Sequence, residues 1–308
     1  MDHRQWDVAI VGGGPAGYSA ALYCVRAGFS TVVLEMLSAG GQMATTAAIE
    51  NYPGFVESVD GFELAMTMQQ QAEKFGSETM YAQVTAAELD GTIKRLHTTE
   101  GLVEARTVIL ATGADPRPLG LPDENALRGR GVAYCATCDG GFYRGKTVAV
   151  AGGGNSAAED ALTLSKLCKK VYVVHRRDRL SATRSYLAPL EQADNVEFVW
   201  NKQITELVHQ DTLSGLTLRD TQTGEESRLD VDGLFVAIGR LPNTELVKGQ
   251  LALDEQGYIL ADETTRTSLP GVFAIGEVRQ KPLRQVVTAV ADGAVASKFV
   301  EEYLGNLA

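Results

Sequence analysis

The chain contains the same short pattern twice, at positions that differ by 140 residues. An apolar run, a glycine-rich turn and an alanine-containing stretch occur at Asp7–Gly17 and again at Thr147–Ala157. Positions 12 and 152, 17 and 157, and 35 and 175 all share this offset of 140. Repetition at a fixed spacing is typical of a duplicated folding unit, and a chain of 308 residues is long enough to give each copy its own core.

The first copy has the order strand, glycine turn, helix, strand. Asp7–Val11 predicts a buried strand, and the helix after the turn runs to Ala27, where Gly28 supplies the stop. Thr31–Leu34 predicts the next strand, which ends in Glu35. This order is typical of a βαβ unit with a parallel sheet.

The glycines of the first turn have separate mechanical roles. Gly12 permits the tight turn, Gly14 lets the backbone approach a pyrophosphate at the helix N-terminus, and Gly17 lets helix and strand pack closely. Glu35 is placed to accept hydrogen bonds from ribose hydroxyls. The pattern predicts a site for FAD or NAD, and a plain glycine-rich turn is the alternative.

The second copy differs from the first at the end of its second strand. Lys146–Ala151, Glu159–Leu167 and Val171–Val174 predict strand, helix and strand, and His175–Arg177 then replaces the acid of the first copy. A carboxylate repels a ribose 2′-phosphate, whereas arginines bind it through charge-assisted hydrogen bonds. The second site is therefore expected to take NADPH, and a solvated basic strand end is the alternative.

A pair of cysteines, Cys135 and Cys138, precedes the second copy, with Asp139 directly behind it. Such a pair can close a reactive disulfide ring, and the adjacent acid can handle the proton that accompanies its opening. Half of a zinc site or an incidental pair are the alternatives. Cys24 and Cys168 lie in apolar, helix-like stretches and are expected to be buried structural thiols, so no metal site is expected.

The composition excludes several classes of partner. The formal net charge is -11, and Arg176–Arg179 is the only basic run, so nucleic acid is not an expected partner. Val8–Val25 is a poor secretory signal because glycines and a proline interrupt it, and no stretch is long and apolar enough to span a membrane. A cytoplasmic redox protein fits best.

The segments around the first turn predict loops, a helix and a meander. Gly40–Gln42 and Ile49–Gly54 belong to a long loop of the kind that lines a site, and Gly61–Phe75 predicts an amphipathic helix. Val84–Thr112 alternates with period two and predicts a three-stranded antiparallel meander, which Val196–Gly239 repeats in the second copy.

The C-terminal part predicts a strand at Gly271–Glu277 and a long helix that begins at Arg284 and Gln285 and runs to Leu304. This segment is expected to return to the first domain and to place Glu277 and the helix N-terminus against a bound cofactor. A plain strand and helix without such a role is the alternative.

Taken together, in this order and spacing, these residues resemble the low-molecular-weight thioredoxin reductases of the bacterial type. The resemblance covers essentially the whole chain. It rests on Gly12–Gly17, Gly41 with Gln42, Ile49–Gly54, Ala111–Gly113, Cys135–Asp139, Gly152–Ala157, His175–Arg177, and Arg284 with Gln285.

The resemblance implies an α/β fold of two Rossmann-like, three-layer nucleotide-binding domains, each with a small antiparallel β-meander. Residues 1–115 and 245–308 would form a discontinuous FAD domain, and residues 116–244 an inserted NADPH domain that carries the cysteine pair. The implied assembly is a homodimer.

The resemblance also implies two sets of cofactor-binding residues. Those for FAD are Gly12, Gly14, Pro15, Ala16, Gly17, Glu35, Gly41, Gln42, Asn51, Val84, Ala111, Thr112, Gly113, Gly276, Glu277, Arg284 and Gln285. Those for NADPH are Gly154, Asn155, Ser156, Ala157, His175, Arg176, Arg177, Ile238 and Gly239.

The implied reaction is that of an NADPH-dependent thioredoxin-disulfide reductase. NADPH gives hydride to the flavin, and the reduced flavin reduces the disulfide, with Cys138 facing the flavin, Asp139 as the acid, and Cys135 attacking the disulfide of thioredoxin. The nicotinamide and the cysteine pair lie in one domain and need the same flavin face, so the domain is expected to rotate about linkers near Asp115–Pro118 and Arg240–Thr244.

Two positions depart from the family pattern. Ser181 stands where the family usually has arginine, which leaves a weaker phosphate clamp or one that uses Arg179 or Arg184 instead. Glu277 stands where the family usually has aspartate, so its extra methylene must be accommodated beside the flavin.

Three other functions remain open at the level of sequence. The same relay would serve another redoxin, or would run in reverse as a dithiol oxidase that delivers electrons to oxygen. A chain of a different class would bind nucleotides as a non-catalytic redox sensor, with the disulfide switching a partner surface.

Overall fold

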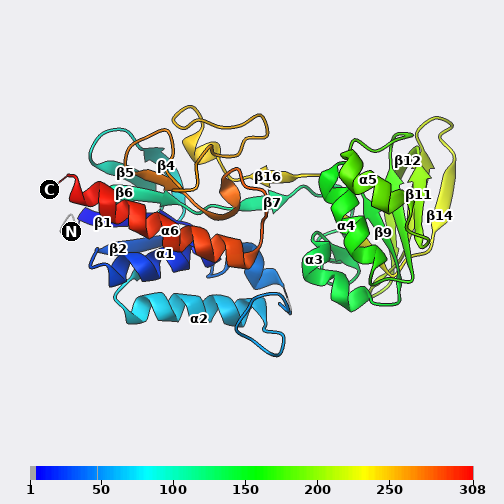
Figure 1. Ribbon diagram of the computed structural model, residues 1–308, viewed down its shortest axis with the longest axis horizontal. Helices are drawn as coiled ribbons and strands as arrows, with labels where there is room; N and C mark the ends of the chain where they lie inside the picture. Colours follow the sequence, from blue (N-terminus) through cyan, green and yellow to red (C-terminus); the bar gives the residue numbers. More distant parts are fainter. Residues whose placement is uncertain (1–4, 47, 308) are drawn as a thin grey trace. The chain divides into compact units, whose positions relative to one another are not determined.

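The computed structural model describes residues 5–46 and 48–307. The chain divides into two compact units, whose elements are labelled in Figure 1. Unit 1 comprises Met1–Asp115 and Leu241–Ala308, and unit 2 is the segment Pro116–Arg240 that lies between them in the sequence.

The second boundary falls after Arg240, earlier than the sequence predicted, which placed it after residue 244. Asn243 accounts for the difference, because its amide nitrogen donates to the carbonyl of Thr112 at 3.0 Å and its own carbonyl accepts from the Thr112 hydroxyl at 2.7 Å. These bonds fasten the returning chain to unit 1. The two crossings, β7 (Ala114–Pro116) and β16 (Arg240–Pro242), pair with each other as a two-stranded sheet.

Unit 1 is built on a seven-stranded sheet of order β3-β2-β1-β6-β5-β4, with β17 also paired to β6. Its parallel strands are β1 (Gln5–Val11), β2 (Thr31–Glu35), β3 (Glu78–Tyr81), β6 (Gly101–Leu110) and β17 (Val272–Ala274). The antiparallel strands are β4 (Val84–Glu88) and β5 (Lys94–Thr98). Pairing of β17 with β6 shows that the C-terminal segment returns to the first unit, as predicted.

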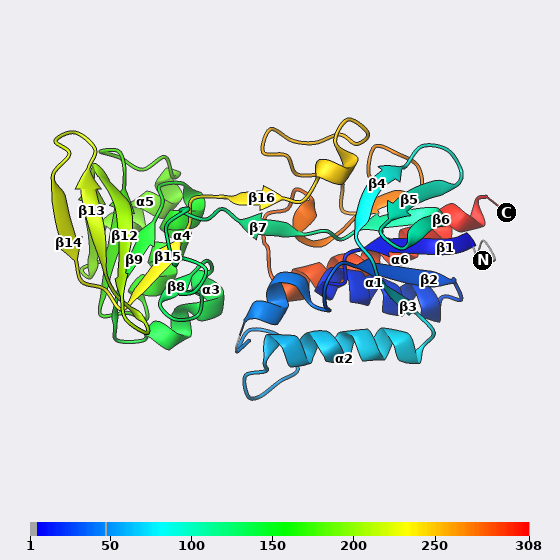
Figure 2. The same cartoon turned by 180° about the vertical axis from the view of Figure 1, so that it is seen from behind.

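Alternate residues of the central strands in unit 1 pack into two separate hydrophobic clusters, one on each face of the sheet. Val8 and Ile10 face a cluster formed with the helices, whereas Ala9 and Val11 face a cluster formed with the meander and the segment 246–278. The helices on the first face are α1 (Pro15–Arg26), α2 (Gly61–Lys74) and α6 (Val286–Gly305), visible in both Figures 1 and 2. Unit 1 therefore has three layers with the sheet in the middle.

Unit 2 repeats this plan around a five-stranded parallel sheet of order β11-β10-β9-β15-β8. Its strands are β8 (Val132–Ala133), β9 (Thr147–Ala151), β10 (Lys170–His175), β11 (Val196–Trp200) and β15 (Gly233–Val236). Its helices are α3 (Ala136–Asp139), α4 (Asn155–Ser165) and α5 (Arg184–Glu191).

The two faces of the unit 2 sheet are again filled by alternate residues. Val148 and Val150 pack with the helices, and Ala149 and Ala151 pack with the meander. That meander is a separate antiparallel sheet of β12 (Lys202–His209), β13 (Leu213–Asp220) and β14 (Glu226–Leu229), seen from behind in Figure 2. The predicted α/β fold of two Rossmann-like, three-layer domains, each with a small antiparallel meander, is confirmed.

The two meanders nevertheless join their sheets differently, which the sequence did not predict. In unit 1 the strand β6 belongs to both the meander and the parallel sheet, whereas in unit 2 the chain breaks at residues 230–232 between β14 and β15. The segment Val196–Trp200, predicted as part of the second meander, is instead a parallel strand on β10. Its alternating pattern reflects a half-buried position at the sheet edge, which periodicity cannot distinguish from a meander strand.

Two element boundaries also differ from the prediction. The strand predicted at Gly271–Glu277 ends at Ala274, because Gly276 takes a φ of +70° and begins the 3₁₀ helix η4 (Gly276–Val278). Helix α4 begins at Asn155, earlier than the predicted start at Glu159, because Gly154 of the glycine turn is its N-cap. The other 3₁₀ helices are η1 (Gly41–Thr45), η2 (Gly140–Tyr143) and η3 (Glu245–Val247). No helix in the described part of the chain is long and apolar enough to cross a membrane.

Candidate active site

The first glycine turn closes tightly between β1 and α1. Gly12 has a φ of +108°, a left-handed conformation that favours glycine, and its N–H donates to the carbonyl of Leu34 at 2.9 Å. A side chain at Gly17 would overlap the carbonyl oxygen of Gly12, so helix and strand approach as closely as the sequence predicted. The turn therefore presents bare backbone at the start of α1.

The N-terminus of α1 is open to an anion. Gly14 is its N-cap and supplies no side-chain hydrogen bond, Pro15 occupies the first turn, and that turn holds no acidic residue. Glu35 closes the other side, since its Oε2 accepts from the N–H of Gly13 at 2.7 Å and its Oε1 from the N–H of Leu37 at 3.0 Å. Free N–H groups and the helix dipole favour a phosphate at this end.

Residues distant in sequence meet near the start of α6. Asn51 donates through Nδ2 to Oε1 of Gln285 at 2.9 Å, and Gln285 is the N-cap of α6. The Arg284 guanidinium lies 4.3 Å from the ring centroid of Tyr258, and its Nε is buried without a hydrogen-bond partner among the described residues. An unsatisfied buried cationic N–H is costly, so a ligand acceptor at this position would stabilise it.

The remaining residues expected at the first site lie on neighbouring connections. Gln42 lies in η1 and donates through Nε2 to Asp115, and the Thr112 hydroxyl is engaged by Asn243. Gly113 has a φ of +70°, and Val84 opens β4 at the rim of the meander-side core. The structure thus joins Asn51 with Gln285, and Thr112 with Asn243, by hydrogen bonds.

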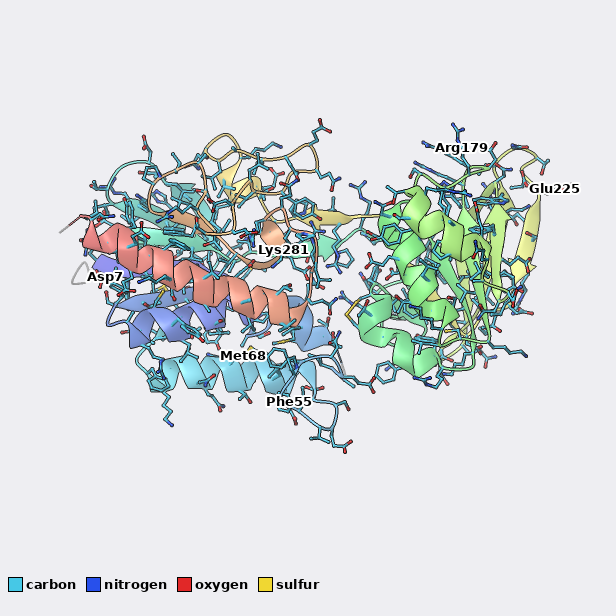
Figure 3. All side chains as sticks on the ribbon, viewed as in Figure 1. Asp7, Phe55, Met68, Arg179, Glu225 and Lys281 are labelled. Atoms are coloured by element: carbon cyan, nitrogen blue, oxygen red, sulfur yellow. A yellow bond between two sulfur atoms is a disulfide. The ribbon has the colours of Figure 1, made fainter. Side chains whose placement is uncertain are left out.

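A buried ion network that sequence reasoning missed supports Gly276. Asp292 of α6 accepts from the Gly276 N–H, from Nε of Arg279 and from Nζ of Lys281 at 2.8, 2.9 and 2.8 Å. Burial alone would raise the pKa of Asp292, but the hydrogen bonds from Arg279 and Lys281 outweigh it and lower this pKa. Lys281, labelled in Figure 3, is anchored on α6 in this way, and the network fixes the start of η4, where Glu277 lies.

The second glycine turn has the same form at the start of α4. Gly154 is the N-cap without a side-chain hydrogen bond, and the first turn of α4 again holds no acidic residue. The His175 ring fills the space beside Gly153, where a side chain would overlap it. Burial lowers the pKa of His175, and the positive charges of Arg177 and Arg176 add to this effect. A neutral imidazole therefore backs the turn at neutral pH.

A pocket of about 730 Å³ opens at the end of β10. It is lined by Arg176, Arg177, Asp178, Arg179, Leu180, Ser181, Asn201, Thr221 and Gln222. Although Ser181 lines this pocket, its hydroxyl already donates a hydrogen bond to the carbonyl of Gly153 at 3.0 Å. Arg184 does not line the pocket and forms an ion pair with Glu191 at 3.2 Å.

The other residues expected at the second site flank this turn. Asn155 accepts through Oδ1 from the N–H of Thr183 at 2.8 Å. Gly239 has a φ of +115°, and its carbonyl accepts from the N–H of Arg117 at 2.9 Å. Sequence reasoning missed Asn201, Thr221 and Gln222, since nothing in their local pattern distinguishes a pocket wall from an ordinary turn.

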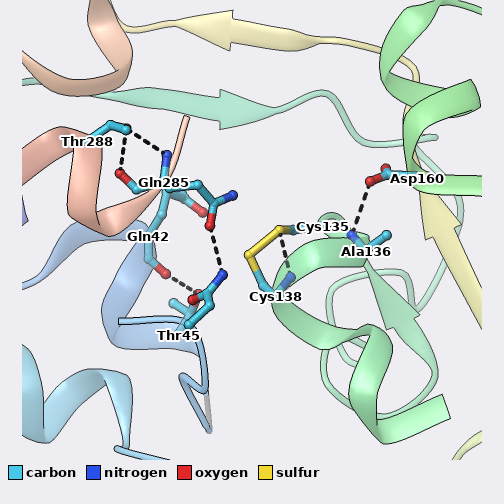
Figure 4. Close-up of a disulfide and its surroundings, with 9 residues drawn as sticks. Gln42, Thr45, Cys135, Ala136, Cys138, Asp160, Gln285 and Thr288 are labelled. Carbon is cyan, nitrogen blue, oxygen red and sulfur yellow. Dashed lines mark hydrogen bonds between the residues drawn. A yellow bond between two sulfur atoms is a disulfide. The ribbon is translucent and has the colours of Figure 1, made fainter. Parts of the chain in front are cut away.

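The cysteine pair forms a disulfide at the start of α3 (Figure 4). Cys135 is the N-cap of that short helix, and its Sγ accepts from the N–H of Cys138 at 3.1 Å. Burial raises the pKa of Asp139 from 3.8 to about 6, and the Arg128 guanidinium opposes the rise. Such a carboxyl can exchange a proton near neutral pH, as a catalytic acid must.

The other two cysteines, Cys24 and Cys168, are free and buried, as predicted. Burial raises the pKa of both thiols, which leaves them protonated and unreactive at neutral pH. No group of three or more histidine, cysteine or acidic side chains that suits a metal ion occurs within residues 5–46 and 48–307.

Comparison with known proteins gives one consistent result. The family model of the pyridine nucleotide-disulphide oxidoreductases matches residues 6–293. A thioredoxin reductase of Streptomyces coelicolor is 46% identical over 304 residues, covering 98% of this chain and 94% of the relative. The thioredoxin reductase of Bacillus subtilis is 42% identical, with 99% and 97% covered.

Solved structures agree with the sequence matches. The crystal structure of thioredoxin reductase from Streptococcus pyogenes has a TM-score of 0.91 and 43% identity, covering 99% of this chain and all of that one. Two nucleotide turns, a disulfide and a three-layer fold place the chain among flavin- and nucleotide-dependent disulfide oxidoreductases. It belongs to the pyridine nucleotide-disulphide oxidoreductases and, within them, to the thioredoxin reductases of the bacterial type.

The cofactors of this family are FAD and NADPH, and the chain's own residues fit both. In unit 1 an uncapped helix N-terminus, the Glu35 carboxylate and the unpartnered Nε of Arg284 suit a dinucleotide without a 2′-phosphate. In unit 2 an uncapped helix N-terminus is followed by an arginine-lined pocket, which suits a dinucleotide that carries one.

Proposed function

We propose that the chain reduces the disulfide of a thioredoxin at the expense of NADPH, with FAD bound by unit 1 and NADPH by unit 2. The observation that carries this proposal is the Cys135–Cys138 disulfide at the start of α3, with the partly buried Asp139 directly behind it. FAD, when bound, accepts a hydride and passes two electrons to a disulfide.

The chemistry after that step belongs to the chain's own residues. When the S–S bond opens, Cys135 and Cys138 hold two reduced sulfurs, and the raised pKa of Asp139 lets its carboxyl hold the accompanying proton. Cys135 Sγ attacks one sulfur of the thioredoxin disulfide and releases the other as a thiol. Cys138 Sγ then attacks Cys135 Sγ, which releases reduced thioredoxin and closes the disulfide again.

We assign the selection of NADPH to the pocket at the end of β10. Arg176, Arg177 and Arg179 line it and supply fork-shaped donors for a 2′-phosphate, while the side chain of Ser181 is occupied by Gly153. Arg179 thus takes the place of the cation that the family usually has at position 181.

A homodimer in the cytoplasm is the assembly and location that fit this function. Large apolar side chains are exposed around the start of α2, where Phe55, Val56 and Phe62 face solvent; Phe55 is labelled in Figure 3. A second copy of the chain would cover such side chains. Sedimentation of the flavin-loaded protein should give a dimer, and a monomer at micromolar concentration would contradict it.

The electron path is tested by Cys138→Ser under anaerobic conditions. NADPH should still bleach the flavin of this variant, but oxidised thioredoxin should not be reduced. Cys168→Ser is the matched control, because Cys168 is a free buried thiol and its replacement should preserve turnover. Thioredoxin reduction by Cys138→Ser at the wild-type rate would exclude the relay, and a panel of other redoxins would identify a different physiological partner.

A further inference from the structure

A second partly buried carboxylate, Asp160, contacts the disulfide segment from α4. Its Oδ1 accepts from the backbone N–H of Ala136 at 3.2 Å, as Figure 4 shows. Ala136 directly follows Cys135 and is only 1% exposed. Water therefore cannot replace Asp160 as the acceptor for this N–H.

The position of this hydrogen bond makes it important for α3. The N–H of Ala136 is one of the donors that the start of that helix leaves without a backbone acceptor, and a buried donor without an acceptor is destabilising. Because α3 consists of a single turn, its own backbone bonds contribute little to hold it. The hydrogen bond to Asp160 on the longer helix α4 therefore helps to keep α3 in place.

The hydrogen bond between Ala136 and Asp160 also affects the position of the Cys135 sulfur. Cys135 is the N-cap of α3, and its Sγ accepts from the N–H of Cys138, which requires that the turn begin at Ala136. A sulfur that accepts a hydrogen bond from a backbone N–H, as Cys135 Sγ does from Cys138, is stabilised as a thiolate, the form that attacks disulfides. Loss of the hydrogen bond between Ala136 and Asp160 would let the turn fray and would remove this stabilisation.

One backbone N–H and two charged side chains act on Asp160. Burial raises its pKa from 3.8 to about 6; the N–H of Ala136 opposes this rise, Glu159 of the same helix adds to it, and Arg240 of β16 opposes it. Asp160 is therefore mostly a carboxylate at pH 7 and a good acceptor for the N–H of Ala136.

We propose that Asp160 is a positioning residue of the disulfide centre, whose carboxylate holds the N–H of Ala136 so that Cys135 Sγ keeps the hydrogen bond from the N–H of Cys138 that favours a reactive thiolate. The proposal rests on the proposed function in one respect, the role of Cys135 as the attacking sulfur. It predicts that Asp160 acts through its hydrogen bond, and that a neutral acceptor of the same shape will replace it.

The test compares Asp160→Asn with Asp160→Ala in the full-length, flavin-loaded protein reduced with dithiothreitol. Alkylation of Cys135 by iodoacetamide is measured against pH and assigned by peptide mass spectrometry, with the buried Cys24 and Cys168 as unreactive references. Asparagine keeps an acceptor oxygen and removes the charge, so its thiol pKa should equal or fall below that of the wild type. Alanine removes both, and its thiol pKa should lie about one unit above that of the asparagine variant, as the loss of one hydrogen bond predicts.

The matched control is Glu159→Gln, the exposed neighbour of Asp160 on α4, which should leave the alkylation profile unchanged. Coincident profiles for the alanine and asparagine variants would overturn the proposal. Flavin content and thermal unfolding show whether each variant is folded. Because alkylation needs neither NADPH nor thioredoxin, failure of the proposed enzyme activity would be seen separately, as wild-type protein that does not reduce thioredoxin.

Discussion

The two glycine turns, Gly12–Gly17 in unit 1 and Gly152–Ala157 in unit 2, have nearly the same backbone at the glycine that caps the helix. Gly14 has φ -80° and ψ -176°, and Gly154 has φ -92° and ψ -173°. The first glycine of each turn donates to the strand that follows the helix, at 2.9 Å in unit 1 and 3.2 Å in unit 2. The difference between the two sites must therefore lie in their side chains.

One position in the repeat carries most of that difference. In unit 1 the carboxylate of Glu35 accepts from the N–H of Gly13, and in unit 2 the ring of His175 fills the corresponding space beside Gly153. The carbonyl of Gly13 accepts from the N–H of Gly40, whereas that of Gly153 accepts from both the N–H and the hydroxyl of Ser181. The repeated turns thus carry different side chains at one position, an acid in unit 1 and the start of a basic run in unit 2, as the proposed binding of two different dinucleotides requires.

The largest effect is expected where the two turns differ in packing. Gly17→Ala places a methyl group on the carbonyl of Gly12, whereas unit 2 already has Ala157 at that position. Such overpacking against backbone costs about 3 kcal/mol, so the variant should lose flavin and unfold at lower temperature. Ala157→Gly, the reverse change, should cost only about 1 kcal/mol. Flavin content and thermal unfolding measure both, and a Gly17→Ala protein with full flavin would show that the turns are not constrained as described.

The next largest effect concerns the basic side of the comparison. Replacing Arg176 and Arg177 together by glutamine removes two charge-assisted contacts, each worth about 1.5 kcal/mol, so binding of 2′,5′-ADP should weaken about a hundredfold. Binding of 5′-AMP, which lacks the 2′-phosphate, should hardly change. Calorimetry measures both, and equal losses for the two ligands would indicate a general fault in unit 2 rather than a phosphate clamp.

A third test uses a feature that unit 2 has and unit 1 lacks, the partly buried acid Asp139 behind the disulfide. Burial raises the pKa of Asp139 to about 6, so the folded protein holds a proton that the unfolded chain has released between pH 4 and 6. The free energy of unfolding therefore falls as pH rises through this window. Asp139→Asn should be more stable than the wild type by about 2 kcal/mol at pH 7, with no gain at pH 4. Thermal unfolding of the oxidised proteins across this range checks the sign; a gain that persists at pH 4 would refute it.

The smallest effect distinguishes two neighbouring arginines of unit 2. Arg179 lines the pocket at the end of β10, whereas Arg184 is paired with Glu191 outside it. Arg179→Gln should weaken 2′,5′-ADP about tenfold, the loss of one charged contact, and Arg184→Gln should leave it within about twofold. A larger loss of affinity in Arg184→Gln than in Arg179→Gln would indicate that Arg184 of α5 binds the 2′-phosphate instead.

The sequence predicted those parts of the site that depend on local spacing. Both turns, the acid at Glu35, the basic run at His175–Arg177 and the cysteine pair lie within short segments whose geometry follows from the strand or helix around them. The return of the C-terminal segment to unit 1 was also predicted, because an apolar strand and helix need a sheet to cover. A single glycine turn left a plain turn as the alternative, and its repetition at an offset of 140 residues favoured a nucleotide site.

The parts that were not predicted depend on which distant segments meet. In the sequence, Asp292 is an ordinary polar residue of a helix rich in small residues. Only the fold shows that Arg279 and Lys281 contact it. Asp160 likewise lies on the same helix as the exposed Glu159, and only the packing of α3 shows which of the two acids turns toward the disulfide. Helical periodicity gives a residue's face but not its neighbour on that face.

The most direct test of the account is anaerobic stopped-flow reduction of the flavin by NADPH and by NADH in the wild-type protein. Unit 2 should select the phosphorylated nucleotide through its arginine pocket, so the second-order rate constant should be at least about tenfold higher with NADPH, since one charged contact already contributes that much. Addition of oxidised thioredoxin should then restore the flavin absorbance. Equal rate constants for the two nucleotides, or a flavin that NADPH does not bleach, would contradict the assignment of two different dinucleotides to the two turns.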